Sequence, residues 1–229
     1  MRTWRLIISK PASGPENMAA DESVFLSAVQ NPDYGPVIRI YNWEKPCITM
    51  GYFQKHSEFS GSGMEITRRP TGGLAVFHGK DISYSIVAGK ADWPHVYNQE
   101  ETYHKFHTCI KDILISMGFQ AEFYPELKQK PPSGNPLCVQ TFFPYDLHVK
   151  GRKILGSSQR RRGEVLLQQG SVHIDAGKFF GVFSSAARNS FEKCLDIRIT
   201  DYNFGESETA AMRSLIEEKY KSDTWNKKY

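Results

Sequence analysis

The stretch GMEITRRPTGGLAVFHGKDISYSIVAG, residues 63–89, carries the pattern that decides the fold. It contains three β-rich pieces, which the turn sequences PTGG and HGKD separate. The alternation of apolar and polar residues in ISYSIV is typical of a half-buried strand. Just before this stretch, PVIRIYNWEKPCITMGYFQ gives two β-rich runs around Asn42 to Pro46, and these predict a hairpin or a corner.

Helical signals lie on both sides of this β-rich region. TWRLIIS has the apolar content of a first strand, and the next segment opens a helix with Ser13 and Glu16 in capping-box spacing and Pro15 in its first turn. Beyond residue 89, apolar residues recur at intervals of three and four, which predicts one face of a helix that ends at Gly118. The residues on this face are Tyr103, Phe106, Ile110, Ile113, Leu114 and Met117.

The second half of the chain adds further strands and helices. YDLHVKGRKILGSSQ contains two strand-like runs around Lys150 and Gly151, and GEVLLQQGSVHID contains another. Two helices are predicted near residues 177–191 and 208–221. Because hairpin-length connections dominate, we predict an α+β fold with a mixed, largely antiparallel sheet and flanking helices.

Size, charge and cysteine spacing narrow the class of protein. The 229 residues fit one domain, residues 1–229, without a separate C-terminal accessory domain, and no apolar run is long enough for a membrane span or a secretory signal. The four cysteines are far apart and form no CxxC pair, which argues against a zinc knuckle or a disulfide scaffold and favours a reducing cytoplasm. The net charge of +4 suits an acidic partner but is too small for a dedicated nucleic-acid binder.

The RRPTGG loop is the first candidate for a binding site. Glycines at 72 and 73 let backbone N–H groups approach a ligand, and Arg69 is available for a negative group. A hairpin turn with solvated arginines would give the same pattern. His78 fits either a catalytic base or a packed, hydrogen-bonded side chain.

A cysteine and a lysine form the second candidate. Cys138 follows a Pro- and Gly-rich loop and lies beside aromatic residues, so it is either a nucleophile or an inert core thiol. Lys153 precedes the small residues Gly156, Ser157 and Ser158, which leave room for a ligand beside a strand. A lysine there could donate to a developing oxyanion or lower the pKa of a thiol, or it could be a surface residue of a basic turn.

Several motifs, taken in chain order, resemble those of the lipoate-protein ligase and octanoyltransferase superfamily, which has the biotin/lipoate protein ligase fold. These motifs are ENMAADESVF, VIRIYNWEKPCITMGYFQ, RRPTGGLAVFHGKDISYSI, Cys138, GRKILGSSQ and VLLQQGSV. The chain lacks the GRGRxGR loop of biotin ligases. It is most similar to the cysteine-dependent octanoyl-[carrier protein]:protein octanoyltransferases. In these enzymes the cysteine precedes the lysine of the GxK segment by 15 positions, which is also the interval between Cys138 and Lys153. In addition, Leu74 stands where lipoate ligases usually have a third glycine after the RRPTGG arginines.

This resemblance implies a reaction and a set of site residues. An octanoyl group would pass from acyl carrier protein to a Cys138 thioester and then to a lysine of a lipoyl-accepting protein, with Lys153 stabilising the oxyanion. The predicted substrate-binding residues are Arg69, Gly72, Gly73, Leu74, Val76, His78, Gly156, Ser157 and Ser158. The predicted wall of the acyl slot is Tyr41, Trp43, Leu74, Val76 and Phe77. No metal or cofactor is expected.

The resemblance also suggests partners and leaves alternatives open. The acceptors would be lipoyl domains of 2-oxoacid dehydrogenase complexes or the glycine cleavage H protein, with no nucleic acid or membrane partner and a monomer as the default. The basic residues Lys150, Arg152 and Arg160 to Arg162 could dock an acidic carrier domain or form solvated loops. An ATP- and Mg-dependent lipoate ligase is the first alternative. A catalytically silent lipoyl-domain-binding protein is the second, because Gln169 stands where relatives commonly have His.

Overall fold

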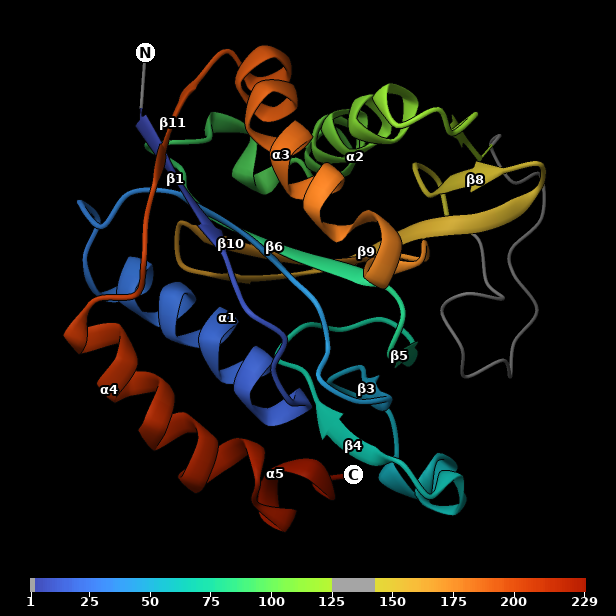
Figure 1. The fold of residues 1–229 in the computed structure, drawn as a ribbon. Helices are drawn as coiled ribbons and strands as arrows, with labels where there is room; N and C mark the ends of the chain where they lie inside the picture. The colour runs from blue at the N-terminus through green and yellow to red at the C-terminus, as the bar shows by residue number, and fades with distance from the viewer. Residues whose placement is uncertain (1–2, 125–142) are drawn as a thin grey trace.

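Two β-sheets form the framework of the molecule, which the computed structural model describes over residues 3–124 and 143–229 (Figure 1). Within these residues the larger sheet has eight strands in the order β11-β1-β2-β6-β10-β9-β8-β7. β1 pairs in parallel with β11 and β2, and the other neighbours in this sheet are antiparallel. The predicted mixed, largely antiparallel sheet is therefore confirmed. The strands are β1 (Thr3–Ile8), β2 (Val37–Tyr41), β6 (Ile82–Gly89), β7 (Glu122–Phe123), β8 (Leu147–Val149), β9 (Arg152–Arg162), β10 (Val165–Val172) and β11 (Arg198–Asp201).

The smaller sheet has the order β4-β3-β5. Its strands are β3 (Cys47–Met50), β4 (Glu65–Arg68) and β5 (Val76–His78). β3 is parallel to β4 and antiparallel to β5. Since β2 belongs to the larger sheet and β3 to the smaller one, the segment from Asn42 to Pro46 is a corner between sheets and not a hairpin.

Helices cover both faces of the larger sheet (Figure 1). α2 and α3 lie on one face, and α1 and α4 lie on the other. The helices are α1 (Gly14–Gln30), α2 (Gln99–Ser116), α3 (Ala176–Leu195), α4 (Glu206–Leu215), a π-helical turn (Ile216–Tyr220) and α5 (Asp223–Asn226), with short 3-10 turns at His56–Glu58, Ser60–Ser62 and Pro94–Tyr97. None of the helices in the described part of the chain is long and apolar enough to cross a membrane.

The helix signals in the sequence correspond to real helix ends. The Ser13 side chain accepts from the Glu16 N–H while the Glu16 carboxylate accepts from the Ser13 N–H, so the predicted capping box opens α1. α2 ends just before Gly118, whose φ of 88° lies in the left-handed region that favours glycine. The two helices predicted near residues 177–191 and 208–221 correspond to α3 and to α4 with its π-helical turn.

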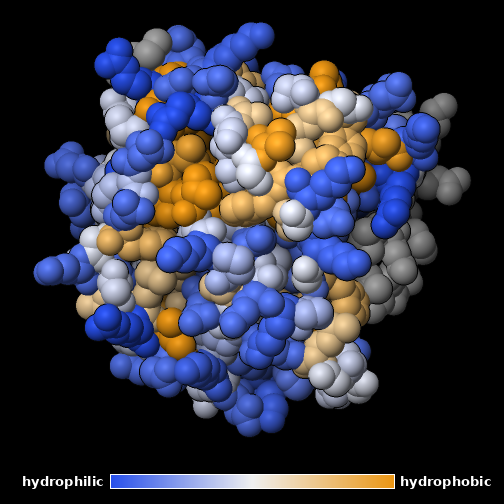
Figure 2. Space-filling view, viewed as in Figure 1, coloured by the Kyte–Doolittle hydropathy of each residue, from blue (hydrophilic) through white to orange (hydrophobic). Residues whose placement is uncertain are grey.

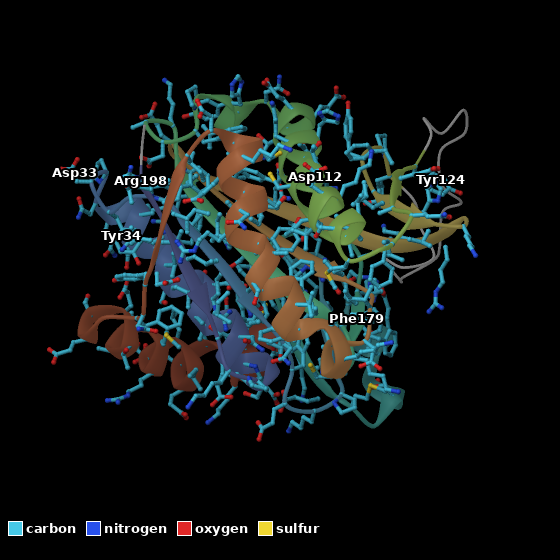
Figure 3. The ribbon with its side chains drawn as sticks, turned by 45° about the horizontal axis from the view of Figure 1, so that its top comes forward. Asp33, Tyr34, Asp112, Tyr124, Phe179 and Arg198 are labelled. Atoms are coloured by element: carbon cyan, nitrogen blue, oxygen red, sulfur yellow. The ribbon has the colours of Figure 1, made fainter. Side chains whose placement is uncertain are left out.

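The main core lies between the larger sheet and the α2–α3 pair. Its α2 side chains are on the predicted apolar face, and Phe106, Ile110 and Leu114 are fully buried. Phe179 near the start of α3, labelled in Figure 3, packs edge-on against Phe119 with ring centroids 5.3 Å apart. In the view of Figure 2, hydrophobic surface gathers over the region of α2 and α3, whereas hydrophilic residues cover most of the surface around α4. The buried apolar face of α2, which carries Phe106, Ile110 and Leu114, explains why α2 and α3 pack together against the sheet.

Strand β6 differs from the sequence prediction. It was expected to be half-buried, but its residues from Ile82 to Ala88 are all buried. The reason is that helices cover both faces of the sheet at this strand. The polar side chains that alternate with the apolar ones are therefore buried as well. They are hydrogen-bonded there: the Ser83 hydroxyl donates to Asp81, and the Ser85 hydroxyl donates to Asp21 at 2.6 Å.

Two tight hairpins set the register of the strands that carry the predicted site. Lys150 and Gly151 both have positive φ, 50° and 78°, as a two-residue primed turn requires, which confirms the predicted hairpin between β8 and β9. The turn between β9 and β10 then pairs Ser157 with Gly170. As a result, the GSS segment of β9 lies directly beside the QGS segment of β10.

Candidate active site

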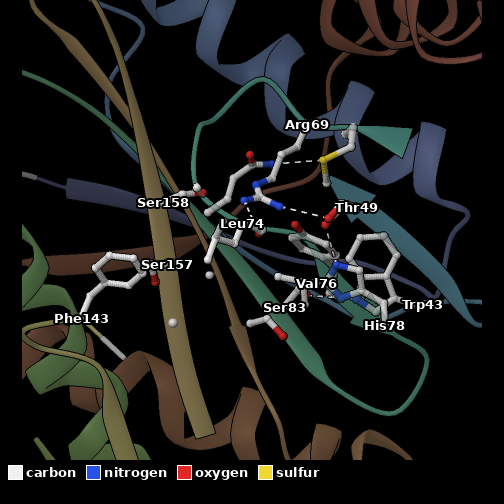
Figure 4. Close-up of a pocket in the computed structure, with 17 residues that line it drawn as sticks. Trp43, Thr49, Arg69, Leu74, Val76, His78, Ser83, Phe143, Ser157 and Ser158 are labelled. Carbon is white, nitrogen blue, oxygen red and sulfur yellow. Dashed lines mark hydrogen bonds between the residues drawn. The ribbon is translucent and has the colours of Figure 1, made fainter. Parts of the chain in front are cut away.

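A cavity lies where the edge of the smaller sheet meets β9 and β10 of the larger one (Figure 4). Its lining combines the RRPTGG loop, β5 and the small residues of β9. The structure brings together every predicted substrate-binding residue except Gly72. The lining residues are Met18, Tyr41, Trp43, Thr49, Arg69, Gly73, Leu74, Val76, His78, Ser83, Phe143, Gly156, Ser157, Ser158, Gln169, Gly170 and Ser171.

Arg69 shapes the glycine loop from inside. Its guanidinium donates to the carbonyls of Thr49 at 3.1 Å, Gly72 at 2.6 Å and Leu74 at 2.8 Å. Gly73 has a φ of 81°, and an added Cβ would lie 3.0 Å from the Arg69 Nη2 atom, so this position favours glycine. Arg69 therefore holds the loop in its curved form. Its predicted contact with a negative group of the substrate stays a prediction.

Gly72 lines a second, adjoining cavity. A Cβ at this position would meet no protein atom within 4 Å, so the space beside Gly72 is open, and its predicted contact with a ligand stays a prediction. The two cavities share Gly73, Phe143, Ser157 and Ser158. The second cavity is otherwise lined by Tyr97, Asn98, Gln99, Glu100, Tyr103, Pro144, Tyr145, Asp146 and Gln159.

His78 is held on three sides. Its Nδ1 lies 2.7 Å from Asp81 Oδ2, its Nε2 lies 2.8 Å from Thr49 Oγ1, and its ring stacks on Trp43 with centroids 3.8 Å apart. Burial by itself would raise the pKa of the Asp81 carboxyl, but the charge and hydrogen bond of His78 and the Ser171 hydroxyl hold that pKa well below its ordinary value. His78 is therefore a packed, hydrogen-bonded wall residue, which is one of its two predicted roles.

Gln169 forms the polar floor of the cavity. Its Nε2 donates to Asp21 Oδ2 at 2.7 Å, and its Oε1 accepts from the Thr71 hydroxyl at 2.8 Å. Asp21 is also paired with Arg39 at 2.8 Å. A neutral histidine offers one donor and one acceptor, and the bonds to Asp21 and Thr71 need one of each. The glutamine thus keeps the floor hydrogen-bonded at the position where the resemblance leads us to expect His.

Comparison with protein families agrees with this arrangement. Residues 13–218 match the model of the lipoyl protein ligase A/B catalytic domain. The chain belongs to this family. The resemblance inferred from the motifs is thereby confirmed.

Curated relatives in the lipoyl protein ligase A/B family include several octanoyltransferases. The chain is 39% identical to octanoyltransferase LipM of Carboxydothermus hydrogenoformans over 191 residues, which cover 80% of this chain and 70% of that protein. It is 30% identical to octanoyltransferase LipM of Bacillus subtilis over an alignment that covers 99% of this chain and 98% of that protein.

Solved structures with the same fold are lipoate ligases. A bipartite lipoate protein ligase from Thermoplasma acidophilum, studied with its E2 lipoyl domain, has a TM-score of 0.75 at 21% identity and covers 99% of this chain and 96% of that one. Lipoate-protein ligase A bound with ATP has a TM-score of 0.77 at 20% identity and covers 99% and 98%. At this identity the likeness concerns the fold, and it confirms the lipoate ligase fold predicted for this chain.

The side chains predicted to hold the acyl chain fall into two groups. Tyr41, Trp43, Leu74 and Val76 line the cavity and give it an apolar wall. Phe77 does not line it: its side chain is 41% exposed and points to the opposite side of β5 from its two neighbours. Alternation along the strand explains this difference, because successive residues face opposite sides of a sheet.

Lys153 is buried in the molecule and is not the surface lysine of a basic turn. It is 1% exposed, and its Nζ lies 2.5 Å from Asp146 Oδ2, which also accepts from the Phe143 N–H at 2.7 Å. Burial raises the pKa of the Asp146 carboxyl, and the charge of Lys153 opposes this rise. Lys153 lines neither of the two adjoining cavities described above. It instead ties residues 143–146 to β9.

One predicted residue of the site lies outside the described part of the chain, and two residues of the site were not predicted. The predicted nucleophile Cys138 lies outside the described residues. Sequence reasoning missed Asp146, the partner of Lys153, and His107 of α2, whose Nε2 lies 2.7 Å from the Ser157 hydroxyl. His107 follows Phe106 on the predicted apolar face, and a histidine beside such a face was the available signal.

The basic residues do not form one patch. Arg152 and Arg162 are at opposite ends of β9, which puts roughly 30 Å between them at about 3.3 Å per residue. Arg160 donates to the Pro70 carbonyl and Arg161 to the Val96 carbonyl, so both are partly buried anchors. Their predicted part in docking an acidic carrier domain stays a prediction.

Proposed function

We propose that this chain transfers an octanoyl group in lipoate assembly, through a thioester on Cys138, to a lysine of a lipoyl-accepting protein. The observation that carries this proposal is the similarity to octanoyltransferases named LipM, which in the case of Bacillus subtilis extends over nearly the whole length of both chains. Similarity at 39% identity to the enzyme of Carboxydothermus hydrogenoformans supports it further. The enzyme is an acyltransferase.

The proposed reaction has two steps. In the first, the Cys138 thiolate attacks the thioester carbonyl of octanoyl-loaded acyl carrier protein, a C–S bond to Cys138 forms, and the carrier thiolate leaves. In the second, the neutral amine of the acceptor lysine attacks the same carbonyl carbon, and a C–N bond forms as the bond to the Cys138 sulfur breaks. The proton that the nitrogen loses returns the cysteine to its thiol form. Exchange of a thioester for an amide is downhill, so the sequence needs no ATP.

The cavity, together with a lysine outside its lining, offers surroundings suited to this chemistry. Tyr41, Trp43, Leu74 and Val76 supply an apolar wall for an eight-carbon chain. Lys153 is proposed to supply positive charge for the thiolate and for the carbonyl oxyanion. Its burial beside residues 143–146, which follow Cys138 closely in the sequence, supports this role. We further propose that residues 1–229 act as a single catalytic domain.

The partners follow from the reaction. Lipoyl transfer requires a lipoyl-accepting protein, and we propose lipoyl domains of 2-oxoacid dehydrogenase complexes or the glycine cleavage H protein as acceptors. Acyl carrier protein is the proposed donor, and the cytoplasm is the proposed compartment. The net charge of +4 favours acidic partners of this kind.

A transfer assay tests the proposal. The purified protein is mixed with octanoyl-loaded acyl carrier protein and a lipoyl domain, and separately with free octanoate, ATP, magnesium and the same domain. Wild type and a Cys194→Ala control, whose thiol lies on α3, should octanoylate the domain without ATP, and Cys138→Ala should lose at least about 100-fold of this rate. Modification that needs ATP and survives Cys138→Ala would establish a ligase instead. Binding of the domain without any modification would establish a silent binding protein.

A further inference from the structure

A directional hydrogen-bond chain ends at His107 and passes through Ser157, a residue that lines both cavities. His107 is 1% exposed, and its two ring nitrogens are both engaged. Nδ1 lies 2.6 Å from the carbonyl oxygen of Tyr145, and Nε2 lies 2.7 Å from Ser157 Oγ. A carbonyl oxygen can only accept, so Nδ1 must carry the proton. In the neutral ring Nε2 is then an acceptor, and the Ser157 hydroxyl donates to it.

The other end of the chain is compatible with this direction. Arg161 has only donors, and its Nη2 contacts Gln159 Oε1 at 2.7 Å. The Gln159 amide therefore donates to Gln168 Oε1 at 2.6 Å, and the Gln168 amide donates to the Tyr84 hydroxyl at 3.1 Å. Because the Ser157 proton is already bonded to His107 Nε2, the Tyr84 hydroxyl donates its own proton to Ser157 Oγ at 2.7 Å. Ser157 therefore accepts from Tyr84 and donates to His107.

This direction determines what Ser157 can offer to a ligand. A hydroxyl has one proton and two lone pairs, and here the proton and one lone pair are used. Within residues 3–124 and 143–229, Tyr84 and His107 are the hydrogen-bond partners of Ser157 Oγ. One lone pair is left on Ser157, which lines both cavities and is labelled in Figure 4. Ser157 can therefore accept a hydrogen bond from a ligand but cannot donate one to a carbonyl oxyanion.

We propose that Ser157 accepts an N–H of the attacking lysine amine and that His107 is a positioning residue that holds the Ser157 proton away from the ligand. The proposal rests on the proposed function. A neutral amine has two N–H groups and one lone pair, so one N–H can bind Ser157 Oγ while the lone pair points at the thioester carbonyl. The thioester offers only acceptors at its carbonyl oxygen, and it gains nothing from Ser157. The contact is therefore specific to the second step of the reaction.

His107 positions the hydroxyl and does not take up a proton itself. Burial lowers the pKa of His107 to about 4, so the ring is neutral near pH 7 and is a weak base. The proton that the amine loses still goes to the leaving Cys138 sulfur, as in the proposed reaction. Ser157 and His107 keep their protons throughout.

Separate measurement of the two steps tests this proposal. The rate of acyl-enzyme formation is measured by intact mass with octanoyl-loaded carrier protein alone, and the rate of transfer is measured after addition of the lipoyl domain. Ser157→Ala removes the acceptor, and His107→Phe frees the serine proton to turn into the cavity. Each variant should slow the second step about tenfold more than it slows the first. His107→Gln, whose amide also carries a donor and an acceptor, should restore most of the second step.

Controls separate positioning from folding. Thr108→Ala removes a hydrogen bond on the same helix and should change neither step. The first step measured on the same preparation reports the folded, active fraction, and His107→Phe carries the test if Ser157→Ala fails to fold. Equal slowing of both steps, or no slowing of the second, would overturn the proposal. Absence of an acyl-enzyme in the wild type would overturn the proposed function, and this inference with it.

Discussion

Replacement of His107 by glutamine should make the stability of the protein less dependent on pH in the acid range. Burial is the main reason that the pKa of His107 falls from 6.5 to about 4, and the positive charge of Lys153 contributes. The unfolded chain therefore binds a proton that the folded chain excludes when the pH lies between these two values. The free energy of unfolding contributed by this group is complete above pH 6.5 and is lost as the pH falls toward 4.

The size of the effect follows from the shift in pKa. At 1.36 kcal/mol for each pH unit, the full range corresponds to about 3 kcal/mol, and the slope at intermediate pH is at most about 1.4 kcal/mol per unit. Glutamine does not titrate, so this contribution disappears in His107→Gln. His173, whose pKa burial also lowers to about 4, keeps its own slope in both proteins.

Urea unfolding at several pH values from neutral to about 4.5 measures this difference. Between neutral pH and about 4.5 the free energy of unfolding of the wild type should fall by about 2.5 kcal/mol relative to that of His107→Gln. His104→Gln serves as a control on the same helix, because this side chain is exposed, and its curve should follow the wild type. Parallel curves for wild type and His107→Gln would refute the assignment of His107 as a buried neutral ring.

Three further changes test the site and its packing. Lys153→Met leaves a buried carboxylate without its counter-charge and should lower the free energy of unfolding by about 3–5 kcal/mol, which thermal or urea unfolding measures. Gly170→Ala places a Cβ 2.3 Å from the facing tyrosine ring and should cost about 1–3 kcal/mol by the same measurement, with a loss of acyl transfer. Val76→Phe narrows the apolar wall and should reduce octanoyl transfer about tenfold relative to a four-carbon group, whereas Phe77→Ala, on the exposed side of the same strand, should leave this ratio unchanged.

Local patterns predicted the local structure well. The capping box of Ser13 and Glu16, the apolar face that ends at Gly118, and the turn at Lys150 and Gly151 all depend on neighbours within a few residues, and all appear in the structure. Environment was harder to predict than conformation. The alternation in β6 fits a half-buried strand, and only the presence of helices on both faces of the sheet makes it fully buried.

The candidate site was predicted as separate pieces, and the structure shows why they belong together. Arg69, His78 and the GSS segment meet because the smaller sheet packs against β9 and β10. His107 and Ser157 are 50 positions apart, and no local pattern relates them. The same holds for the chain from Arg161 to Tyr84, whose direction depends on which side chains can only donate or only accept. Such partners become visible only when the fold is known.

The central claim is that Cys138 carries the acyl group. The most direct test is intact mass measurement of the protein after mixing with octanoyl-loaded acyl carrier protein alone, followed by peptide mapping and treatment with hydroxylamine. We predict one octanoyl adduct on the peptide that contains Cys138, removed by hydroxylamine and absent from Cys138→Ala. An adduct on another residue, or octanoylation of a lipoyl domain by Cys138→Ala at the wild-type rate, would contradict the account.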